Sequence, residues 1–107
     1  MASYQVEVTN QVRKEIRQLP GNMRQRVLRT LQTLKQKPRP DISRSLDTTK
    51  AGIALEPGTE LCCIRMASWR IVYLVEEELR LVSVLAIRKR PPYQYEDLQE
   101  LIVALRG

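Results

Sequence analysis

The chain has 107 residues, which is enough for one domain and too short for two. Hydrophobic residues make up 43% of the sequence and charged residues 28%, a composition typical of a folded soluble domain rather than a disordered chain. No apolar run reaches the ~20 residues that a membrane span needs, and the first residues lack the basic and apolar regions of a signal peptide. We therefore expect a single domain over residues 1–107, located in the cytoplasm.

The charge balance points towards an anionic partner. Lysine and arginine total 18 against 12 acidic residues, which gives a formal net charge of +6. A basic domain of this size attracts polyanions, and nucleic acid is the commonest of them. The chain has no histidine, and the adjacent thiols of Cys62 and Cys63 cannot form a zinc site alone, so we expect neither metal nor cofactor. In a strand these two side chains point to opposite faces, so a disulfide between them is geometrically poor. We expect one thiol to be buried and the other exposed.

The first third of the chain predicts a strand and a helical hairpin. Residues 4–8 alternate between apolar and polar side chains, as a half-buried strand does. Asn10 can cap a first amphipathic helix, which Pro20-Gly21 ends, and a second amphipathic helix follows as far as Pro38. Two such helices joined by a Pro-Gly break are typical of an αα-hairpin.

The rest of the chain predicts three strands and one helix. Residues 41–57 are rich in turn formers and form a loop with room for one short strand. Three extended stretches follow with short breaks between them, over residues 61–66, 70–75 and 79–87, and the last two are apolar on both faces, as central strands are. Pro91-Pro92 precedes a helix over residues 98–105. We therefore expect an α+β domain in the order β-α-α-β-β-β-α, with an antiparallel sheet packed by the N-terminal hairpin and the C-terminal helix.

One ordered set of motifs resembles a known family. The set consists of a strand, a helical hairpin ending at Pro38-Arg39-Pro40, the stretch Trp69-Arg70-Ile71-Val72-Tyr73, and the basic cluster Arg88-Lys89-Arg90 followed by two tyrosines. In this respect the chain resembles the RelE/ParE toxins, from Tyr4 to about Leu105. The resemblance implies a RelE-like fold and two partners, mRNA in the ribosomal A site and a cognate antitoxin. It also implies a metal-independent endoribonuclease that inhibits translation and leaves a 2′,3′-cyclic phosphate and a 5′-hydroxyl.

The resemblance further implies a set of site residues. Arg70 matches the family's sheet arginine, which contacts the scissile phosphate, and Arg90 matches the arginine that stabilises the phosphate and the leaving group. Tyr95, or alternatively Tyr93, matches the tyrosine that orients or deprotonates the 2′-hydroxyl. The further RNA-binding residues that we expect are all cationic: Arg65, Lys50, Arg88, Lys89, Arg24 and Arg29.

Elementary chemistry is consistent with these roles. An arginine fork clamps phosphoryl oxygens with two parallel hydrogen bonds, and cations near a tyrosine lower its pKa by favouring the phenolate. The chain departs from the RelE pattern at two positions, because Leu61 and Cys63 stand where that protein has strand lysines. Lys50 or the basic face of the second helix would have to compensate for them.

Other interpretations remain open. The chain could be a ParE-like DNA gyrase inhibitor, or a catalytically inactive member that binds an antitoxin or nucleic acid. Arg70 could pair with the acidic turn at residues 76–78, and residues 88–90 could be a solvated strand end. Tyr73, within an apolar strand, is expected in the core, and Tyr93 and Tyr95 could pack against the last helix.

Overall fold

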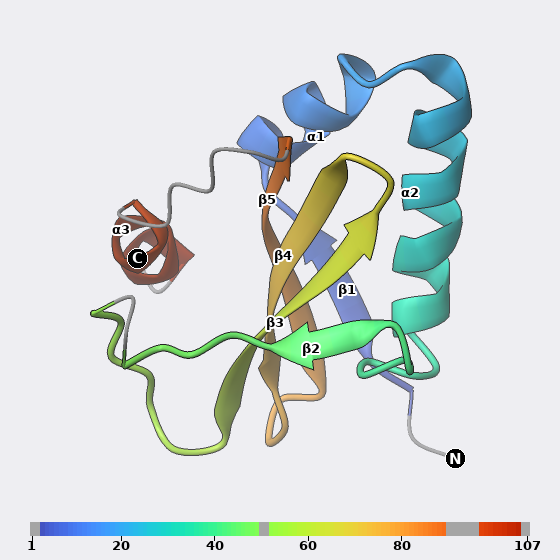
Figure 1. Cartoon of the computed structure of the whole chain (residues 1–107). Coiled ribbons are helices and arrows are strands. Elements are labelled where there is room, and N and C mark those ends of the chain that lie inside the picture. Colours follow the sequence, from blue (N-terminus) through green and yellow to red (C-terminus); the bar gives the residue numbers. More distant parts are fainter. Residues whose placement is uncertain (1–2, 50–51, 90–96, 106–107) are drawn as a thin grey trace.

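The computed structural model describes residues 3–49, 52–89 and 97–105 (Figure 1). The elements in chain order are β1 (Gln5–Val8), α1 (Asn10–Arg17), α2 (Gly21–Leu34), β2 (Ser43–Ser45), β3 (Thr59–Met66), β4 (Trp69–Glu76), β5 (Leu81–Lys89) and α3 (Leu98–Leu105). The α+β class and the predicted order are confirmed, and the short strand β2 occupies the loop that had room for one.

The strands form one sheet in the order β1-β5-β4-β3-β2. Neighbouring strands from β2 to β5 are antiparallel, whereas β1 pairs with β5 in parallel. The sequence predicted an antiparallel sheet, and the sheet is instead mixed. The alternating pattern of residues 4–8 predicts a strand but carries no information about its partner. That partner, residues 81–84, lies at the far end of the chain.

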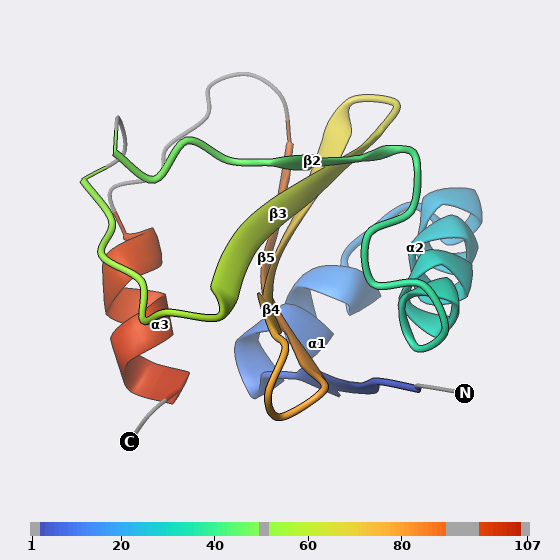
Figure 2. The ribbon, with the colours of Figure 1, turned by 90° about the horizontal axis from the view of Figure 1, so that it is seen from below.

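Helices cover both faces of the sheet. Figure 2 shows α1 and α2 on one side and α3 on the other. The core on the first side includes Val12, Val27 and Tyr73, and the core on the second side includes Leu74 and Leu98, all fully buried. Burial of a side chain of this size contributes roughly 1.5–3 kcal/mol. The central strands are therefore apolar on both faces because each face has its own core.

The two cysteines show the same two-sided burial. Cys62 belongs to the core under α1 and α2, and Cys63 belongs to the core on the α3 side, so the thiols point to opposite faces as expected. Both are free, and only 1% of Cys62 and 5% of Cys63 is exposed. The expectation that one thiol would be exposed is wrong, because both faces of β3 are covered.

Side-chain hydrogen bonds cap the start of α1 and join this helix to the sheet. Thr9, rather than Asn10, caps α1, and its Oγ1 accepts a hydrogen bond from the Val12 backbone at 3.1 Å. The Glu15 carboxylate accepts the backbone N–H of Ile87 at 3.0 Å. The pairing of β1 with β5 ends at Val8, so α1 supplies the partner that β5 lacks beyond that point.

Candidate functional site

Three arginines lie side by side across the three central strands. Arg70 on β4 is directly opposite Arg65 on β3 and directly opposite Arg88 on β5. Neighbouring strands lie about 4.8 Å apart, so the three Cα atoms span only about 10 Å. The turn of Ala67 and Ser68, in which Ala67 has a φ of 53°, sets the register of the first pair. We refer to Arg65, Arg70 and Arg88 as the arginine row.

Strand alternation places the arginine row on the α3 face of the sheet. Cys63 and Val72 belong to the core on that face, and Arg65 and Arg70 lie two residues from them along their strands. On β5 a register shift opposite Val72 and Tyr73 inserts one residue, which brings Arg88 to the same face. Arg70, in the middle of the row, is only 7% exposed.

A hollow of about 710 Å³ opens beside the row. Its lining residues are Asp41, Ile42, Arg44, Ser45, Leu46, Cys63, Arg65 and Arg70. We call it the β2 hollow, because β2 and the residues flanking it supply five of these eight residues. Small-molecule sites in proteins typically measure about 300–1,000 Å³, so the hollow has room for a ligand of nucleotide size.

Arg44 is a residue of this site that sequence reasoning missed. It lies on β2 directly opposite Cys63. The Ser-Arg-Ser sequence of β2 is too short and too polar to show a strand pattern. Its only signal was an arginine within the loop of residues 41–57, and nothing in the sequence indicated which strand that loop would join.

The β2 hollow is electrostatically positive. Among the residues that the structure describes, neither Arg44 nor Arg65 forms an ion pair. Burial raises the pKa of the Cys63 thiol, while Arg70, Arg65 and Arg44 oppose that rise through their charges. The acidic residue of the lining, Asp41, lies 3.4 Å from the Lys37 ammonium and is almost fully exposed. An anion entering the hollow therefore meets three arginines and a neutral thiol.

Arg88, at the end of the arginine row, is bound to a carboxylate. Its Nη1 and Nη2 donate to the two oxygens of Asp97 at 2.9 and 2.6 Å. This contact lowers the pKa of Asp97. Asp97 immediately precedes α3, so Arg88 links β5 to the C-terminal helix. RNA binding by Arg88 remains a prediction, and it would compete with this ion pair.

Three other predicted RNA-binding residues, Lys89, Arg24 and Arg29, do not join this site. Lys89 is paired with Trp69, which packs on the core under α1 and α2, so it faces the opposite side of the sheet from Arg88. Arg24 and Arg29 lie on α2 in that same layer, and Arg24 donates to the backbone oxygens of Arg17 and Leu19 at 3.0 and 3.2 Å. Arg24 thereby has a structural role, satisfying carbonyls at the end of α1.

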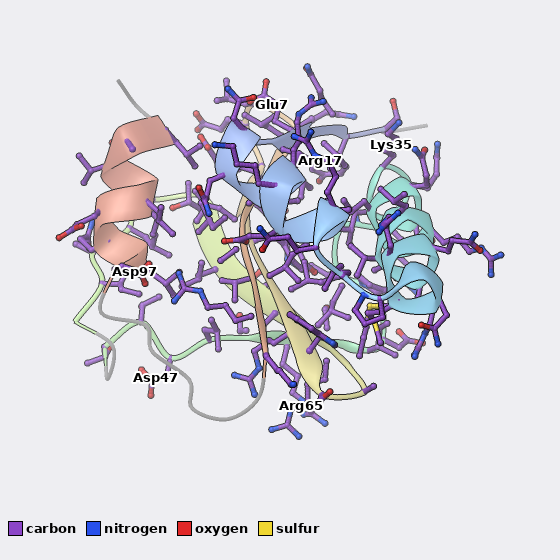
Figure 3. All side chains as sticks on the ribbon, turned by 90° about the horizontal axis from the view of Figure 1, so that it is seen from above. Glu7, Arg17, Lys35, Asp47, Arg65 and Asp97 are labelled. Carbon is purple, nitrogen blue, oxygen red and sulfur yellow. The ribbon has the colours of Figure 1, made fainter. Side chains whose placement is uncertain are left out.

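Figure 3 places Arg65 relative to the helical hairpin. Arg65 lies beside the hairpin that joins β3 to β4, far across the view from Arg17 and Lys35 of the helical hairpin. The predicted residues Arg90, Tyr93, Tyr95 and Lys50 lie outside the described residues.

The alternative partner considered for Arg70 is excluded by distance. Arg70 lies near the start of β4, and the acidic turn of residues 76–78 begins at the other end of that strand. Six residues of extended chain separate them by about 20 Å. The middle arginine of the row is therefore not held by the turn at residues 76–78.

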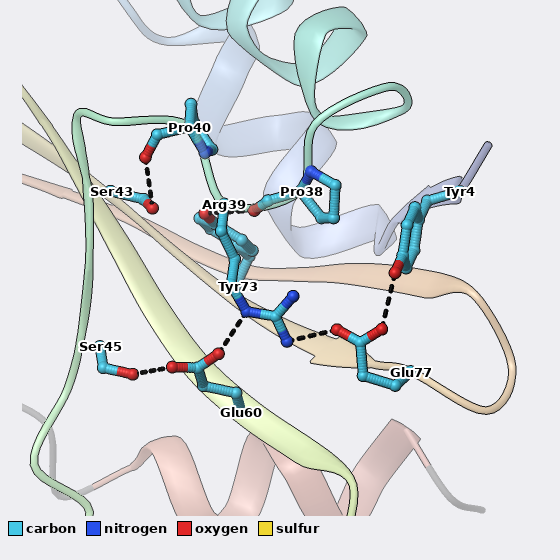
Figure 4. Close-up of polar contacts among 9 residues, drawn as sticks. All are labelled: Tyr4, Pro38, Arg39, Pro40, Ser43, Ser45, Glu60, Tyr73 and Glu77. Carbon is cyan, nitrogen blue, oxygen red and sulfur yellow. Dashed lines mark hydrogen bonds and ion pairs between the residues drawn. The ribbon is translucent and has the colours of Figure 1, made fainter. Parts of the chain in front are cut away.

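A second polar network supports the β2 wall of the hollow (Figure 4). Arg39 forms ion pairs with Glu60 of β3 and with Glu77 of the β4–β5 turn. Tyr4 donates to Glu77 at 2.6 Å, and Ser45 of β2 donates to Glu60. The Ser45 hydroxyl and then the Arg39 guanidinium lower the pKa of Glu60.

Tyr73 holds the segment that carries Arg39. Its hydroxyl donates to the Pro38 backbone oxygen at 2.7 Å, its side chain is fully buried, and burial raises its pKa. The expectation that Tyr73 belongs to the core is confirmed. Arg39 and Tyr73 therefore shape the site without lining the hollow.

Two further properties are absent from the described residues. They contain no group of three histidine, cysteine or acidic side chains that could hold a metal ion. None of their helices is long and apolar enough to cross a membrane.

Comparison with known proteins identifies the fold. No protein-family model matches the chain, and no curated protein matches its sequence. Solved structures do match in three dimensions, and the fold they define is that of the RelE-like toxins.

The archaeal RelE–RelB complex from Pyrococcus horikoshii OT3 matches with a TM-score of 0.72 and 21% identity, over 85% of this chain and 99% of that one. The toxin–antitoxin complex RelBE2 from Mycobacterium tuberculosis matches with a TM-score of 0.62 and 20% identity, over 82% and 99%. The isolated RelE toxin of E. coli matches with a TM-score of 0.58 and 20% identity, over 96% and 99%. The expected RelE-like fold is thereby confirmed.

Proposed function

We propose that the chain is the toxin of a type II toxin–antitoxin system, a ribosome-dependent endoribonuclease that cleaves mRNA in the ribosomal A site. The observation that carries this proposal is the arginine row, with the buried Arg70 at its centre and the β2 hollow beside it. A row of guanidinium groups on a rigid sheet is suited to a phosphodiester, whose transition state gains negative charge. The RelE-like fold supports the same function.

Arg70 is the residue that we assign to the scissile phosphate. Its side chain lies between two strands that each present another arginine, and its burial restricts its motion. A held guanidinium can bind two phosphoryl oxygens at once and needs no reorganisation as the reaction proceeds. We propose Arg90 as the second phosphate and leaving-group contact and Tyr95, or Tyr93, as the residue that orients or deprotonates the 2′-hydroxyl. The products would be a 2′,3′-cyclic phosphate and a 5′-hydroxyl.

Dependence on the ribosome fits a site with no histidine base. Correct placement of reacting groups can supply roughly 7–11 kcal/mol of a reaction barrier. A ribosome that holds the mRNA in an in-line geometry would supply this placement, and the toxin would then add charge stabilisation. This function belongs in the cytoplasm, where mRNA is translated.

We propose a cognate antitoxin as the protein partner. A groove of about 480 Å³ between α1 and α2 is lined by Val8, Arg13, Ile16, Arg17, Leu28 and Leu31. Four of these residues are apolar and two are cationic, and Leu28 is 46% exposed. An amphipathic segment with acidic residues at its edge matches this combination, and charge complementarity would speed its association.

A second candidate function follows from two positions on β3. Leu61 is only 1% exposed and packs in the core, and Cys63 is also buried, where the RelE pattern has lysines. The loss of these two cations favours a ParE-like gyrase inhibitor, or an inactive member that keeps only antitoxin or nucleic-acid binding.

Expression of the chain without a partner tests the proposal. We expect translation to stop and primer extension on cellular mRNA to show cuts within codons in the reading frame. Arg70→Ala should relieve the arrest, and Arg26→Ala is the matched control, because it removes one exposed arginine from α2 on the opposite side of the sheet. Intact mRNA together with a supercoiling defect would replace the proposal with the gyrase alternative.

A further inference from the structure

Strand pairing brings one cation into the β2 hollow from outside the arginine row. Arg44 on β2 is directly opposite Cys63 on β3, and Arg65 lies two residues further along β3 on the same face. Arg65 is in turn opposite Arg70. Three guanidinium groups from three neighbouring strands therefore line one hollow.

Arg44, like Arg65, differs from Arg39 and Arg88 in forming no ion pair among the described residues. Arg39 is held by Glu60 and Glu77, and Arg88 is held by Asp97. In the part of the chain that the structure describes, Arg44 has no carboxylate partner, although it lines a hollow of about 710 Å³. Its charge is therefore available to an incoming anion.

The segment that carries Arg44 is fixed in place. Ser45, the next residue, donates to Glu60, and Glu60 pairs with Arg39. On the other side, the Ser43 hydroxyl donates to the Pro40 backbone oxygen at 2.7 Å. Arg44 thus projects from a strand that is anchored on both sides, which is the condition for a preorganised contact.

We propose that Arg44 is a phosphate-binding residue, which together with Arg65 holds a backbone phosphate of single-stranded RNA in the β2 hollow, next to the phosphate at Arg70. The inference rests on the proposed function in taking RNA as the ligand. Arg44 acts as a positioning residue, because it binds a phosphate other than the one that reacts. It also supplies, from the neighbouring strand, a cation at the place where β3 presents the thiol of Cys63.

The test measures binding of the full chain to an RNA oligonucleotide with 2′-O-methyl groups on every ribose, which removes the attacking hydroxyl. Arg44→Ala should weaken binding roughly tenfold, the scale of a hydrogen bond to a charged group. The slope of log K against log salt should become shallower by about 0.7, the value for one phosphate contact on a single strand. Arg44→Lys, which keeps the charge but loses the fork, should retain the salt slope and part of the affinity.

Two further variants separate local from general effects. Arg26→Ala removes the same charge from an exposed site on α2 and should change affinity by less than about twofold. Adding Cys63→Lys to Arg44→Ala places an ammonium directly opposite the lost arginine and should restore much of the affinity and the salt slope. If that double variant fails to fold, the comparison of Arg44→Ala, Arg44→Lys and Arg26→Ala still decides the matter.

Several outcomes would overturn the inference. An unchanged affinity and salt slope in Arg44→Ala would do so, as would a loss equal to that of Arg26→Ala. Competition of an acidic peptide for Arg44, with RNA binding unaffected by the substitution, would assign the residue to a protein partner instead. If wild-type protein cleaves mRNA on ribosomes but Arg44→Ala binds RNA normally, the inference fails and the proposed function stands. If Arg44→Ala weakens binding although wild-type protein does not cleave, the proposed function fails and the phosphate site stands.

Discussion

The guanidinium of Arg88 and the carboxylate of Asp97 form a two-pronged ion pair, with both nitrogen-to-oxygen distances below 3 Å. The pair connects the end of β5 to the residue before α3. Leu98, the first residue of α3, is fully buried in the core on that face. One charged contact and one apolar contact therefore fix the start of the helix that covers the second side of the sheet.

Replacing Asp97 by Asn should loosen α3. The Asn amide keeps the size of the side chain but loses the charge that binds both nitrogens of Arg88, and amide hydrogen exchange over residues 98–105 should become faster. The loss of global stability should stay below about 1 kcal/mol, because the carboxylate is half exposed. Asp41→Asn, which breaks the exposed pair with Lys37, is the matched control and should leave exchange in α3 unchanged. Equal exchange in α3 for both variants would show that the ion pair does not hold the helix.

Acid should destabilise the fold through carboxylates that are ion-paired in the native state. The native pKa values of Asp97, Glu60 and Glu77 lie below their ordinary values because of hydrogen bonds from Arg88, Ser45 and Tyr4 respectively, with Arg39 adding to the last two. Their stabilisation is complete above the unfolded pKa values, near 4, and is lost as pH falls through the lower native values. Urea unfolding between pH 7 and pH 3 should therefore show stability falling from about pH 5 downwards. In Glu60→Gln this decline should be smaller, and an identical decline would exclude Glu60 as a source.

Tyr73→Phe should cost stability without affecting activity. The substitution removes the hydroxyl that donates to the Pro38 oxygen, and a hydrogen bond of this kind contributes about 0.5–1.5 kcal/mol. Denaturant unfolding measures the loss. Tyr4→Phe, at the exposed bond to Glu77, is the control and should lower stability much less than Tyr73→Phe does. A large drop in mRNA cleavage by folded Tyr73→Phe protein would place this hydroxyl in the chemistry and contradict its assignment to the core.

Arg70→Ala should impair cleavage far more than ribosome binding. Removing a preorganised donor to a developing negative charge typically lowers the rate about 10²–10³-fold. Single-turnover cleavage on programmed ribosomes measures this, and sedimentation with ribosomes measures binding. Circular dichroism checks the fold, since Arg70 is buried. Arg70→Lys should recover only part of the rate, because an ammonium lacks the two-pronged geometry. Parallel losses of binding and cleavage would reduce Arg70 to an electrostatic anchor.

The strands that could be predicted are those in which the pattern of apolar residues depends on burial of the strand itself. Residues 70–75 and 81–85 are apolar at successive positions, which occurs when both faces of a strand are buried, and β4 and β5 were located to within two residues. Arg70 and Arg88 were singled out on the same strands. Their alignment with Arg65 depends on hairpin register, to which the short break at residues 67–68 gave a local clue.

The features that could not be predicted depend on pairing between distant segments. Arg44 joins the site because residues 43–45 bond to residues 62–64 across a long loop, and three polar residues carry no signal for that choice. The expectation of one exposed thiol was wrong for a similar reason, since Cys63 belongs to a core that includes Leu98 and Ile102 from the far end of the chain. The separation of Arg24 and Arg29 from the arginine row likewise follows from the layer in which α2 packs.

The parallel pairing of β1 with β5 affects the order in which the molecule can assemble. Synthesis delivers β1 first, yet its hydrogen-bond partners are residues 81–84, and α1 also packs on β5. Contacts between segments so far apart in sequence form late, because the intervening chain must first be brought together. The arginine row requires Arg88 from the same strand. A growing polypeptide therefore cannot complete either the sheet or its row of cations until β5 has left the ribosome that is making it.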